Sequence, residues 1–415
     1  MKLFSHQAQA LERVKNFNKC AFYHDMGLGK TFTGGEKLRS LGAQINLVIC
    51  QKSKIKDWLE HFKKYFSDFE IIDATQTSEL VKLLNKKTKK IIVLNYDLVW
   101  RRGFVNDLND FTLLLDESSL IQNDKSKRTK AILKLKFKNI ILLSGTPVGG
   151  KYENLFTQLK LLGWEIKKSE YWRNFVDFAM VKYGSYTPYI PKINGYKNVD
   201  LLKQTLTKYG ADFLRTDEVL DLPVQNINTI ECDLCKEYKQ FNKDDFIKIK
   251  DLELVGDTAL KKLLYLRKLA SCYNDNKYNA FKDLIDSTED RLIIFYSFNE
   301  ELKRLKEIAK DKPISIINGG TKSLENYNKY DNSITFIQYQ SGAMGLNLEK
   351  ANKIIYFSLT LSSENFEQSK KRIHRIGQNR PCFYYILLAK NSIDEKIYKT
   401  LQKRNDYTLD LFLKS

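Results

Sequence analysis

Two short segments place a lysine, a threonine and two carboxylates in patterns that favour phosphate chemistry. The first is a glycine-rich stretch that ends in Lys30 and Thr31, just ahead of a helical pattern. Backbone N–H groups of such a loop wrap a phosphate chain, a lysine ammonium balances its charge, and a threonine hydroxyl binds Mg²⁺. The second is Asp116–Glu117, at the end of an apolar run. Asp116 would bind the same Mg²⁺, and Glu117 would orient or deprotonate the attacking water.

The glycine-rich stretch departs from the strict phosphate-loop pattern, because His24 stands where that pattern has glycine. Taken alone, the stretch could be an ordinary turn that caps a helix, and the acidic pair on a second strand favours nucleotide binding. We therefore expect catalytic roles for Lys30, Asp116 and Glu117 and a Mg²⁺ site at Thr31 and Asp116. The residues expected to bind ATP here are Asp25, Met26, Gly27, Leu28, Gly29, Lys30 and Thr31.

The charge balance indicates a polyanionic partner. The 415 residues include 69 Lys and Arg against 50 Asp and Glu, a net charge of +19. For a nucleotide hydrolase such a surplus favours nucleic acid, although a basic surface can also serve only solubility. No apolar run approaches the roughly 18 residues of a membrane span, and no signal peptide is readable. We expect no membrane association and a cytoplasmic location in a bacterial or virus-infected cell, or a nuclear one in a eukaryote.

The hydrophobic pattern predicts an α/β protein with two similar halves. Apolar runs of four to six residues alternate with amphipathic segments, which indicates parallel sheets covered on both faces. In the first half the expected strands are 45–50, 91–96, 112–115 and 140–143, and the expected helices are 55–65 and 127–135. In the second half the expected strands are 292–296, 314–317, 334–337, 354–357 and 383–388, and the expected helices are 300–310 and 364–375.

The strand pattern fades between about residues 164 and 290, which predicts helical protrusions and a linker. Residues 183–191 favour an irregular loop. The aromatics and lysines of 183–197 leave nucleic-acid contact open, although a packed surface loop fits them better. We expect a first lobe over 1–225, with a helical protrusion at about 164–215. Residues 226–415 would hold the linker, a second helical protrusion and the second lobe.

With these segments in order, the chain resembles the Swi/Snf-type branch of the superfamily-two helicase-like, DNA-dependent ATPases, from residue 3 to about 403. The resemblance implies two tandem RecA-like parallel-sheet lobes that use ATP and Mg²⁺. It also implies that Gln7, beside His6, reads adenine. The segment Asp116–Glu117–Ser118–Ser119 replaces the family's Asp-Glu-Ala-His, so the contact by which that histidine couples the motifs is lost, whereas hydrolysis is not affected.

The same resemblance implies a set of nucleic-acid contacts and a relay. The segment 51–53, followed by Trp58, resembles a motif that contacts the nucleic-acid backbone, and 144–147 resembles a Gly-Thr-Pro motif that relays nucleotide state. A cap by Ser53 and a plain strand-ending turn are the alternatives. The residues expected to contact nucleic acid are Lys52, Ser53, Asn95, Tyr96, Ser144, Thr146, Ser297, Ser341 and Gly342. Gly345 and Gln368 are expected to join the ATP-binding set.

The run 368–378 is the sharpest match to the family. Arg372 and Arg375 lie three apart, so on a helix both would point from one face. Two guanidinium groups aimed at a γ-phosphate stabilise phosphoryl transfer and are worth about 10³ or more in rate. A basic helix face on the surface is the alternative.

The implied function is an ATP-driven motor on double-stranded or branched DNA, sequence-independent because phosphates are gripped. It would remodel DNA or protein–DNA complexes in repair, recombination or replication, with branch migration as one such activity. A different class of protein also fits: a nucleotide-gated DNA clamp, a subunit of a larger repair or restriction machine without processive stepping. An RNA helicase fits less well, because the run 372–378 does not have the RNA-helicase form.

Overall fold

The computed structural model describes residues 3–76, 88–182, 188–249, 252–339 and 346–412, with side chains up to Arg404. The chain divides into two compact units. The first unit comprises Met1–Val219 with Asp406–Ser415, and the second comprises Leu220–Asn405. The sequence-based division is at residue 225. Within the described ranges, no helix is both long and apolar enough to cross a membrane.

A seven-stranded parallel sheet forms the centre of the first unit, in the order β3-β4-β2-β5-β6-β1-β9. Its strands are β1 (Lys19–His24), β2 (Ile45–Cys50), β3 (Glu70–Asp73), β4 (Lys90–Asn95), β5 (Asn109–Asp116), β6 (Lys136–Ser144) and β9 (Ala211–Leu214). Alternate residues of a strand serve opposite faces. In β2, Leu47 and Ile49 enter one hydrophobic core while Val48 and Cys50 enter another. The sheet is therefore buried on both sides.

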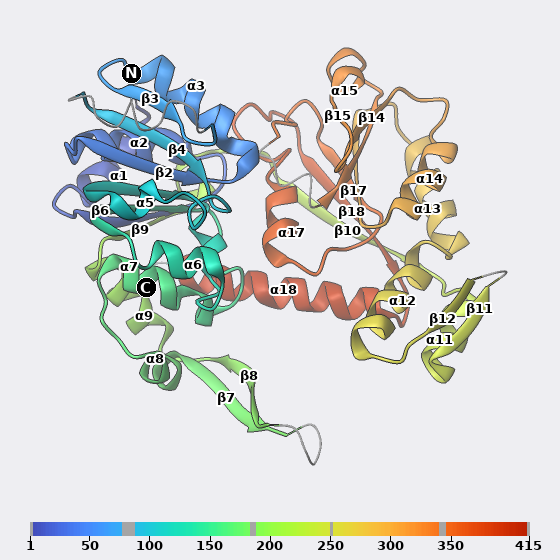
Figure 1. Ribbon diagram of the computed structural model, residues 1–415. Helices are drawn as coiled ribbons and strands as arrows, with labels where there is room; N and C mark the ends of the chain where they lie inside the picture. The colour runs from blue at the N-terminus through green and yellow to red at the C-terminus, as the bar shows by residue number, and fades with distance from the viewer. Residues whose placement is uncertain (1–2, 77–87, 183–187, 250–251, 340–345, 413–415) are drawn as a thin grey trace. The chain divides into compact units, whose positions relative to one another are not determined.

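Helices cover both faces of this sheet (Figure 1). One core receives side chains from α1 (Ser5–Arg13), α2 (Lys30–Ser40) and α3 (Ile55–Tyr65). The other receives them from α5 (Phe104–Asp107), α6 (Lys127–Ile132), α7 (Phe156–Leu162), α8 (Lys168–Phe175) and α9 (Val199–Lys208). Short turns η1 (Lys52–Lys54), η2 (Ser118–Ile121), η3 (Tyr152–Leu155) and α10 (Thr216–Val219) complete the unit.

The second unit has its own seven-stranded sheet, in the order β10-β18-β17-β13-β16-β14-β15, parallel except for the last pair. Its strands are β10 (Gln225–Cys232), β13 (Leu292–Tyr296), β14 (Ile314–Ile317), β15 (Lys322–Ser323), β16 (Ile334–Gln338), β17 (Lys353–Tyr356) and β18 (Cys382–Ala389). The helices are α11 (Lys236–Asp244), α12 (Ala259–Ser271), α13 (Asp275–Asp286), α14 (Asn299–Ile308), α15 (Glu325–Lys329) and α17 (Ser363–Lys370), together with α18 (Ile393–Phe412) up to Asn405. The predicted α/β fold with two tandem RecA-like lobes is confirmed.

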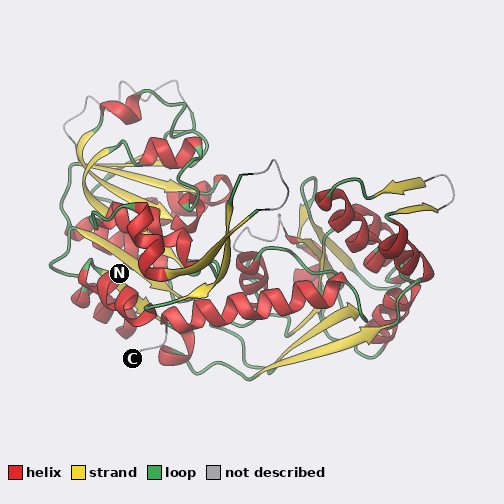
Figure 2. Ribbon diagram, turned by 90° about the horizontal axis from the view of Figure 1, so that it is seen from below, coloured by secondary structure: helices red, strands yellow, loops and turns green. Residues whose placement is uncertain are grey.

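The stretch between about 164 and 290 contains strands that the sequence did not indicate. β7 (Val176–Val181) and β8 (Ile190–Tyr196) pair antiparallel as a ribbon separate from the large sheet (Figure 2), and β11 (Phe246–Ile249) pairs with β12 (Leu252–Val255). The loop expected at 183–191 ends within β8, and residues 183–187 lie outside the described ranges. Most residues of β7 and β8 are at least partly exposed. The stretch also contains helices, such as α8 and α9, as expected, and the two strand pairs were not expected. An exposed ribbon needs no alternation of buried residues, so its sequence carries no strand signal.

Candidate nucleotide site and nucleic-acid surface

The phosphate loop connects β1 to α2 and depends on two glycines with left-handed backbone conformation. Gly27 has φ 87° and Gly29 has φ 73°, a region that other residues seldom adopt. A Cβ atom at position 29 would lie 2.3 Å from Gln7 Nε2, so a side chain there would displace the Gln7 amide. The first N–H groups of a helix have no partner within it, and at the start of α2 they form a ready site for an anion.

Lys30 is the first residue of α2, and its ammonium is held by carbonyls of the same loop. Its Nζ donates to His24 O at 2.9 Å and to Asp25 O at 3.2 Å. A Cβ at Gly145 would lie 3.3 Å from this Nζ, so the segment after β6 packs beside the ammonium. The positive charge is therefore placed at the loop, where a bound phosphate chain needs it.

Asp25, at the start of the loop, is tied to the chain after β9. Its Oδ2 accepts a hydrogen bond from Thr216 N at 3.1 Å, and its own N–H donates to Leu214 O at 2.9 Å. These contacts fix the start of the loop to the edge strand of the sheet. The carboxylate of Asp25 thus has a structural role here, alongside its predicted place in the ATP-binding set.

The acidic pair follows β5, and two aromatic side chains hold it. Trp58 Nε1 donates to Asp116 Oδ2 at 2.8 Å, and Tyr96 OH donates to Asp116 O at 2.8 Å. Burial raises the pKa of Asp116, and the Trp58 hydrogen bond and the charges of Lys30 and Lys54 oppose that rise. Asp116 ends β5 and the loop of Lys30 follows β1, the two parallel strands that flank β6, so both residues lie at the same edge of the sheet. Such a pair fits a nucleotide with Mg²⁺ on Asp116 and the neighbouring Thr31 of α2.

Glu117 adopts a left-handed conformation, with φ 52°. For a residue with a Cβ this costs of order 1–3 kcal/mol, and such strain concentrates at functional sites. The turn η2 begins directly after it. The unusual backbone therefore turns the chain sharply at the residue expected to position water.

Gln7 braces the phosphate loop from α1. Its Nε2 donates to Leu28 O at 3.2 Å and to Gly29 O at 3.4 Å, and its Oε1 accepts from Phe4 N at 3.0 Å. His6 Nε2 lies 3.1 Å from Leu28 O. The resemblance implied that Gln7 reads adenine, which stays a prediction; the observed contacts give the same amide a role in holding the loop.

A basic cavity of about 780 Å³ lies in the first unit, where β2, β3 and β4 end. It brings the predicted contacts Lys52 and Asn95 together. Its charged and polar lining residues are Lys52, Lys56, Arg101, Arg102, Thr75, Asn95, Asp73 and Asp97. The indole of Trp100 is 41% exposed, with Arg101 Cζ 4.6 Å and Lys127 Nζ 5.0 Å from its centre. Cations beside an exposed aromatic ring are suited to a nucleic-acid strand.

Tyr96 does not belong to that surface. Only 2% of the residue is exposed, and its hydroxyl is bound to the backbone of the acidic segment. This burial argues against direct contact between Tyr96 and nucleic acid. Ser144 is also buried, and its Oγ accepts from Thr146 N at 3.1 Å. Ser53 lies within η1, next to Lys52.

In the second unit, the helix expected to carry both arginines stops before either of them. α17 ends at Lys370, and Arg372 and Arg375 lie in the turns that follow. The prediction of a helix to residue 375, with both arginines on one face, was wrong. Ile373 is fully buried, and Arg372 O accepts from Leu348 N at 3.1 Å, so contacts with another segment replace helical ones.

Arg372 is buried within the second unit, and Arg375 contacts side chains of the same unit. Arg372 is only 7% exposed. Arg375 Nη1 contacts Asn347 Oδ1, and its Nε lies 3.9 Å from Glu349 Oε2. Gln368, on α17, donates from Nε2 to Glu364 Oε1 at 3.2 Å. The expected residues Ser341, Gly342 and Gly345 lie outside the described ranges.

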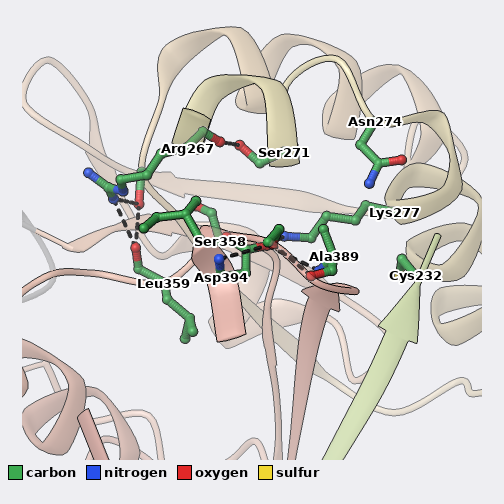
Figure 3. Close-up of polar contacts among 12 residues, drawn as sticks. Cys232, Arg267, Ser271, Asn274, Lys277, Ser358, Leu359, Ala389 and Asp394 are labelled. Carbon is green, nitrogen blue, oxygen red and sulfur yellow. Dashed lines mark hydrogen bonds and ion pairs between the residues drawn. The ribbon is translucent and has the colours of Figure 1, made fainter. Parts of the chain in front are cut away.

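Ser297, the remaining predicted contact, follows β13 and adjoins a network of buried polar groups. Arg267 Nη2 lies 3.4 Å from Ser297 Oγ. It also donates to Leu359 O at 2.9 Å (Figure 3). The same figure shows the buried ion pair of Lys277 and Asp394, with Nζ and Oδ2 2.7 Å apart. This network fixes the segment after β13, and the half-buried hydroxyl of Ser297 with it.

Sequence reasoning missed Gln158, and it did not predict that Trp58 and Tyr96 hold the acidic segment. Trp58 was expected in a nucleic-acid motif, and its indole donates a hydrogen bond to Asp116, which is predicted to be catalytic. Gln158, in α7, hydrogen-bonds both Ser118 and Pro147. The signal that could have identified Gln158 is a polar residue between the leucines of the repeat 155–162.

The fold and the phosphate loop define a nucleotide-binding α/β protein with two RecA-like lobes. The model of the SNF2-related domain matches residues 9–278, and that of the helicase conserved C-terminal domain matches residues 276–377. The chain belongs to the SNF2-related family.

Relatives of this chain are distant and longer. A Mycoplasma genitalium protein described as an uncharacterized ATP-dependent helicase is 25% identical over 92% of this chain, which spans 39% of that protein. A DNA repair protein of Schizosaccharomyces pombe is 22% identical over 92% of this chain, which spans 54% of it. The Sulfolobus solfataricus SWI2/SNF2 ATPase core in complex with dsDNA aligns with a TM-score of 0.47 and 20% identity, over 98% of this chain and 92% of that one.

Proposed function

We propose that this chain is a DNA-dependent ATPase motor. It would translocate on double-stranded or branched DNA and remodel DNA or protein–DNA complexes in repair, recombination or replication, with branch migration as one such activity. One observation carries the proposal: in a chain of the SNF2-related family, the loop with Lys30 follows β1 and Asp116 ends β5, and these two parallel strands flank β6, so both residues lie at one edge of the sheet. We place the protein in the cytoplasm of a bacterial or virus-infected cell, or in the nucleus of a eukaryotic one.

Hydrolysis in this proposal depends on residues that hold charge and water in place. The loop 25–29 and the start of α2 bind the phosphates, and Lys30 exchanges its carbonyl partners for phosphate oxygens. Thr31 and Asp116 would hold Mg²⁺, which would supply positive charge to the phosphate oxygens. Glu117 orients or deprotonates the attacking water.

Arg372 and Arg375 act as the arginine fingers of this reaction in the proposal. They belong to the second unit, whereas Lys30 and Glu117 belong to the first. Turnover therefore requires the two units to close on the nucleotide and to reopen, and these motions would step the protein along DNA.

The DNA-binding part of the proposal rests on charge. The net charge is +19, and four basic side chains line the cavity at the ends of β2, β3 and β4. Contacts of this kind reach phosphates, so binding should weaken with salt and depend little on sequence. The Schizosaccharomyces pombe relative is a DNA repair protein, which fits a role in repair.

ATPase rates across a series of DNA ligands test this function. We expect linear duplexes to stimulate hydrolysis, with a rate that rises with duplex length, and forks and four-way junctions to act as substrates for branch migration. A rate indifferent to length would favour the DNA clamp instead. Stimulation by RNA alone would contradict the proposal, as would an absence of ATP hydrolysis with every ligand.

A further inference from the structure

The side-chain amide of Gln158 connects three segments of the first unit. Its Oε1 accepts from Ser118 Oγ at 2.7 Å and from Tyr23 OH at 3.0 Å. Its Nε2 donates to Pro147 O at 2.8 Å. Gln158, Ser118 and Tyr23 are all 0% exposed, so these hydrogen bonds do not compete with bulk solvent.

The three partners lie at the ends of neighbouring strands. Ser118 follows the acidic pair at the end of β5, and Pro147 follows Ser144–Thr146 at the end of β6. Tyr23 is the penultimate residue of β1, just ahead of the phosphate loop. Since β5, β6 and β1 are adjacent in the sheet, one amide joins the hydrolytic segment, the segment after β6 and the strand that carries the loop.

Glutamine at position 158 does more than fill space. In α7, Phe156, Leu159, Leu161 and Leu162 enter the hydrophobic core, and Thr157 and Gln158 are buried polar residues beside them. An apolar side chain at 158 would leave the buried hydroxyls of Tyr23 and Ser118 and the carbonyl of Pro147 without this partner, which would cost free energy. Both the oxygen and the nitrogen of the Gln158 amide are hydrogen-bonded. Rotation of the amide would therefore break all of these hydrogen bonds together.

We propose that Gln158 is a positioning residue that couples the acidic segment after β5 to the segment 144–147. This inference rests on the proposed DNA-stimulated ATPase, and it adds a physical connection between the nucleotide site and a predicted nucleic-acid contact. A displacement of Pro147 must either carry the amide with it or break the hydrogen bond. If the amide follows, Ser118 and the neighbouring Glu117 move as well.

The connection passes through Ser118, which stands in the segment where the family's histidine is replaced. Coupling in this chain therefore does not require that histidine. A hydroxyl and an amide provide the contact between the two segments, and the side chain that joins them comes from α7.

The variant Gln158→Met removes all three hydrogen bonds at nearly constant volume. We expect the ratio of DNA-stimulated to unstimulated kcat to fall by about fivefold or more, a typical coupling between sites. The stimulated rate should fall further than the unstimulated rate, and the KM for ATP should change little. A general packing defect would instead lower both rates together and leave their ratio unchanged.

Two further variants make the test specific. Asn154→Leu is the matched control, because Asn154 Nδ2 donates to Val148 O at 2.9 Å, an amide–carbonyl bond in the same region that does not involve Ser118. Its stimulation ratio should stay that of the wild type. Ser118→Ala removes only the link to the acidic segment, and it should lower the ratio even if Gln158→Met does not fold. Combined with Gln158→Met, it should add little.

Hydrogen exchange with a nonhydrolysable ATP analogue tests the coupling without DNA. In the wild type, the analogue should slow exchange at 27–34 and at 144–150. In Gln158→Met or Ser118→Ala, only the effect at 144–150 should be lost. The inference is overturned if the analogue still slows exchange at 144–150 in both variants, or if it does not slow exchange there in the wild type. A wild type that responds in exchange but is never stimulated by DNA would contradict the proposed function and leave the coupling supported.

Discussion

The beginning of α2 and the end of α17 are two helix boundaries with expected catalytic residues beside them, and they are specified differently. At α2, Gly27 and Gly29 have positive φ values, and Lys30 follows at once in the helix. At α17, the helical pattern continues past the point where the helix ends, and Arg372 lies in a turn. A boundary set by local backbone freedom is readable in the sequence, whereas one set by contacts with another segment is not.

The same difference applies to how the charged side chains are held. Lys30 is bound by carbonyls of its own loop, five and six residues away. Arg375 is held by Asn347 and Glu349, in a segment more than 25 residues away in sequence. The hydrogen bonds of the Lys30 ammonium given above are thus local in sequence, and those of Arg375 depend on tertiary packing. Four predictions test this contrast.

Lys30→Ala should have the largest effect. Loss of the ammonium removes charge stabilisation at the phosphates, and we expect kcat to fall by about 10²–10³-fold or more. DNA binding should remain, because the basic cavity is separate from the loop. Lys15→Ala is the control, since Lys15 is exposed and paired with Glu12. Steady-state ATPase rates and DNA-binding titrations check both, and full activity in Lys30→Ala would refute the assigned role.

Arg372→Ala should lower kcat by about 10²-fold or more while ATP binding is retained, as expected for a transition-state contact. Because Arg372 is buried, Arg372→Lys provides a second variant that keeps the charge and loses the planar fork; its rate should also fall. Arg380→Ala, at an exposed arginine paired with Asp290, should keep wild-type rates. Equal losses in all three variants would point to damaged packing rather than catalysis.

Gln7→Ala should weaken ATP binding by about tenfold, since it removes the hydrogen bonds from the amide to the phosphate loop. Comparison of ATP with GTP separates the two roles of this side chain. If Gln7 reads adenine, the preference for ATP over GTP should shrink in the variant. Equal weakening for both nucleotides would restrict Gln7 to bracing the loop.

Arg101→Ala should have the smallest effect, a loss of DNA affinity by a few-fold. If its guanidinium reaches a phosphate, the slope of log Kd against log salt should decrease by about 1. Lys208→Ala, at an exposed lysine of α9, is the control and should leave affinity and slope unchanged. An unchanged slope in Arg101→Ala would remove the basic cavity from the DNA surface.

Sequence patterns predicted the two sheets well, because buried parallel strands must be continuously apolar. They failed at the ribbon of β7 and β8, whose exposed residues carry no periodic signal. They did not indicate that the side chain of Tyr96 is buried, because a residue at the end of a strand can face solvent or pack inward. Its hydroxyl reaches Asp116 O across the sheet, a contact between residues 20 apart in sequence.

The sequence by itself determined the phosphate loop, the acidic pair and the two-sheet architecture. Each follows from short-range rules: glycine permits positive φ, a helix start attracts anions, and strands buried on both faces are apolar. Only the tertiary structure decided where α17 stops, which indole holds Asp116, and that the amide of Gln158 connects three segments. Those features depend on side chains distant in sequence, since a buried polar group takes whichever partner the completed fold brings within hydrogen-bonding distance.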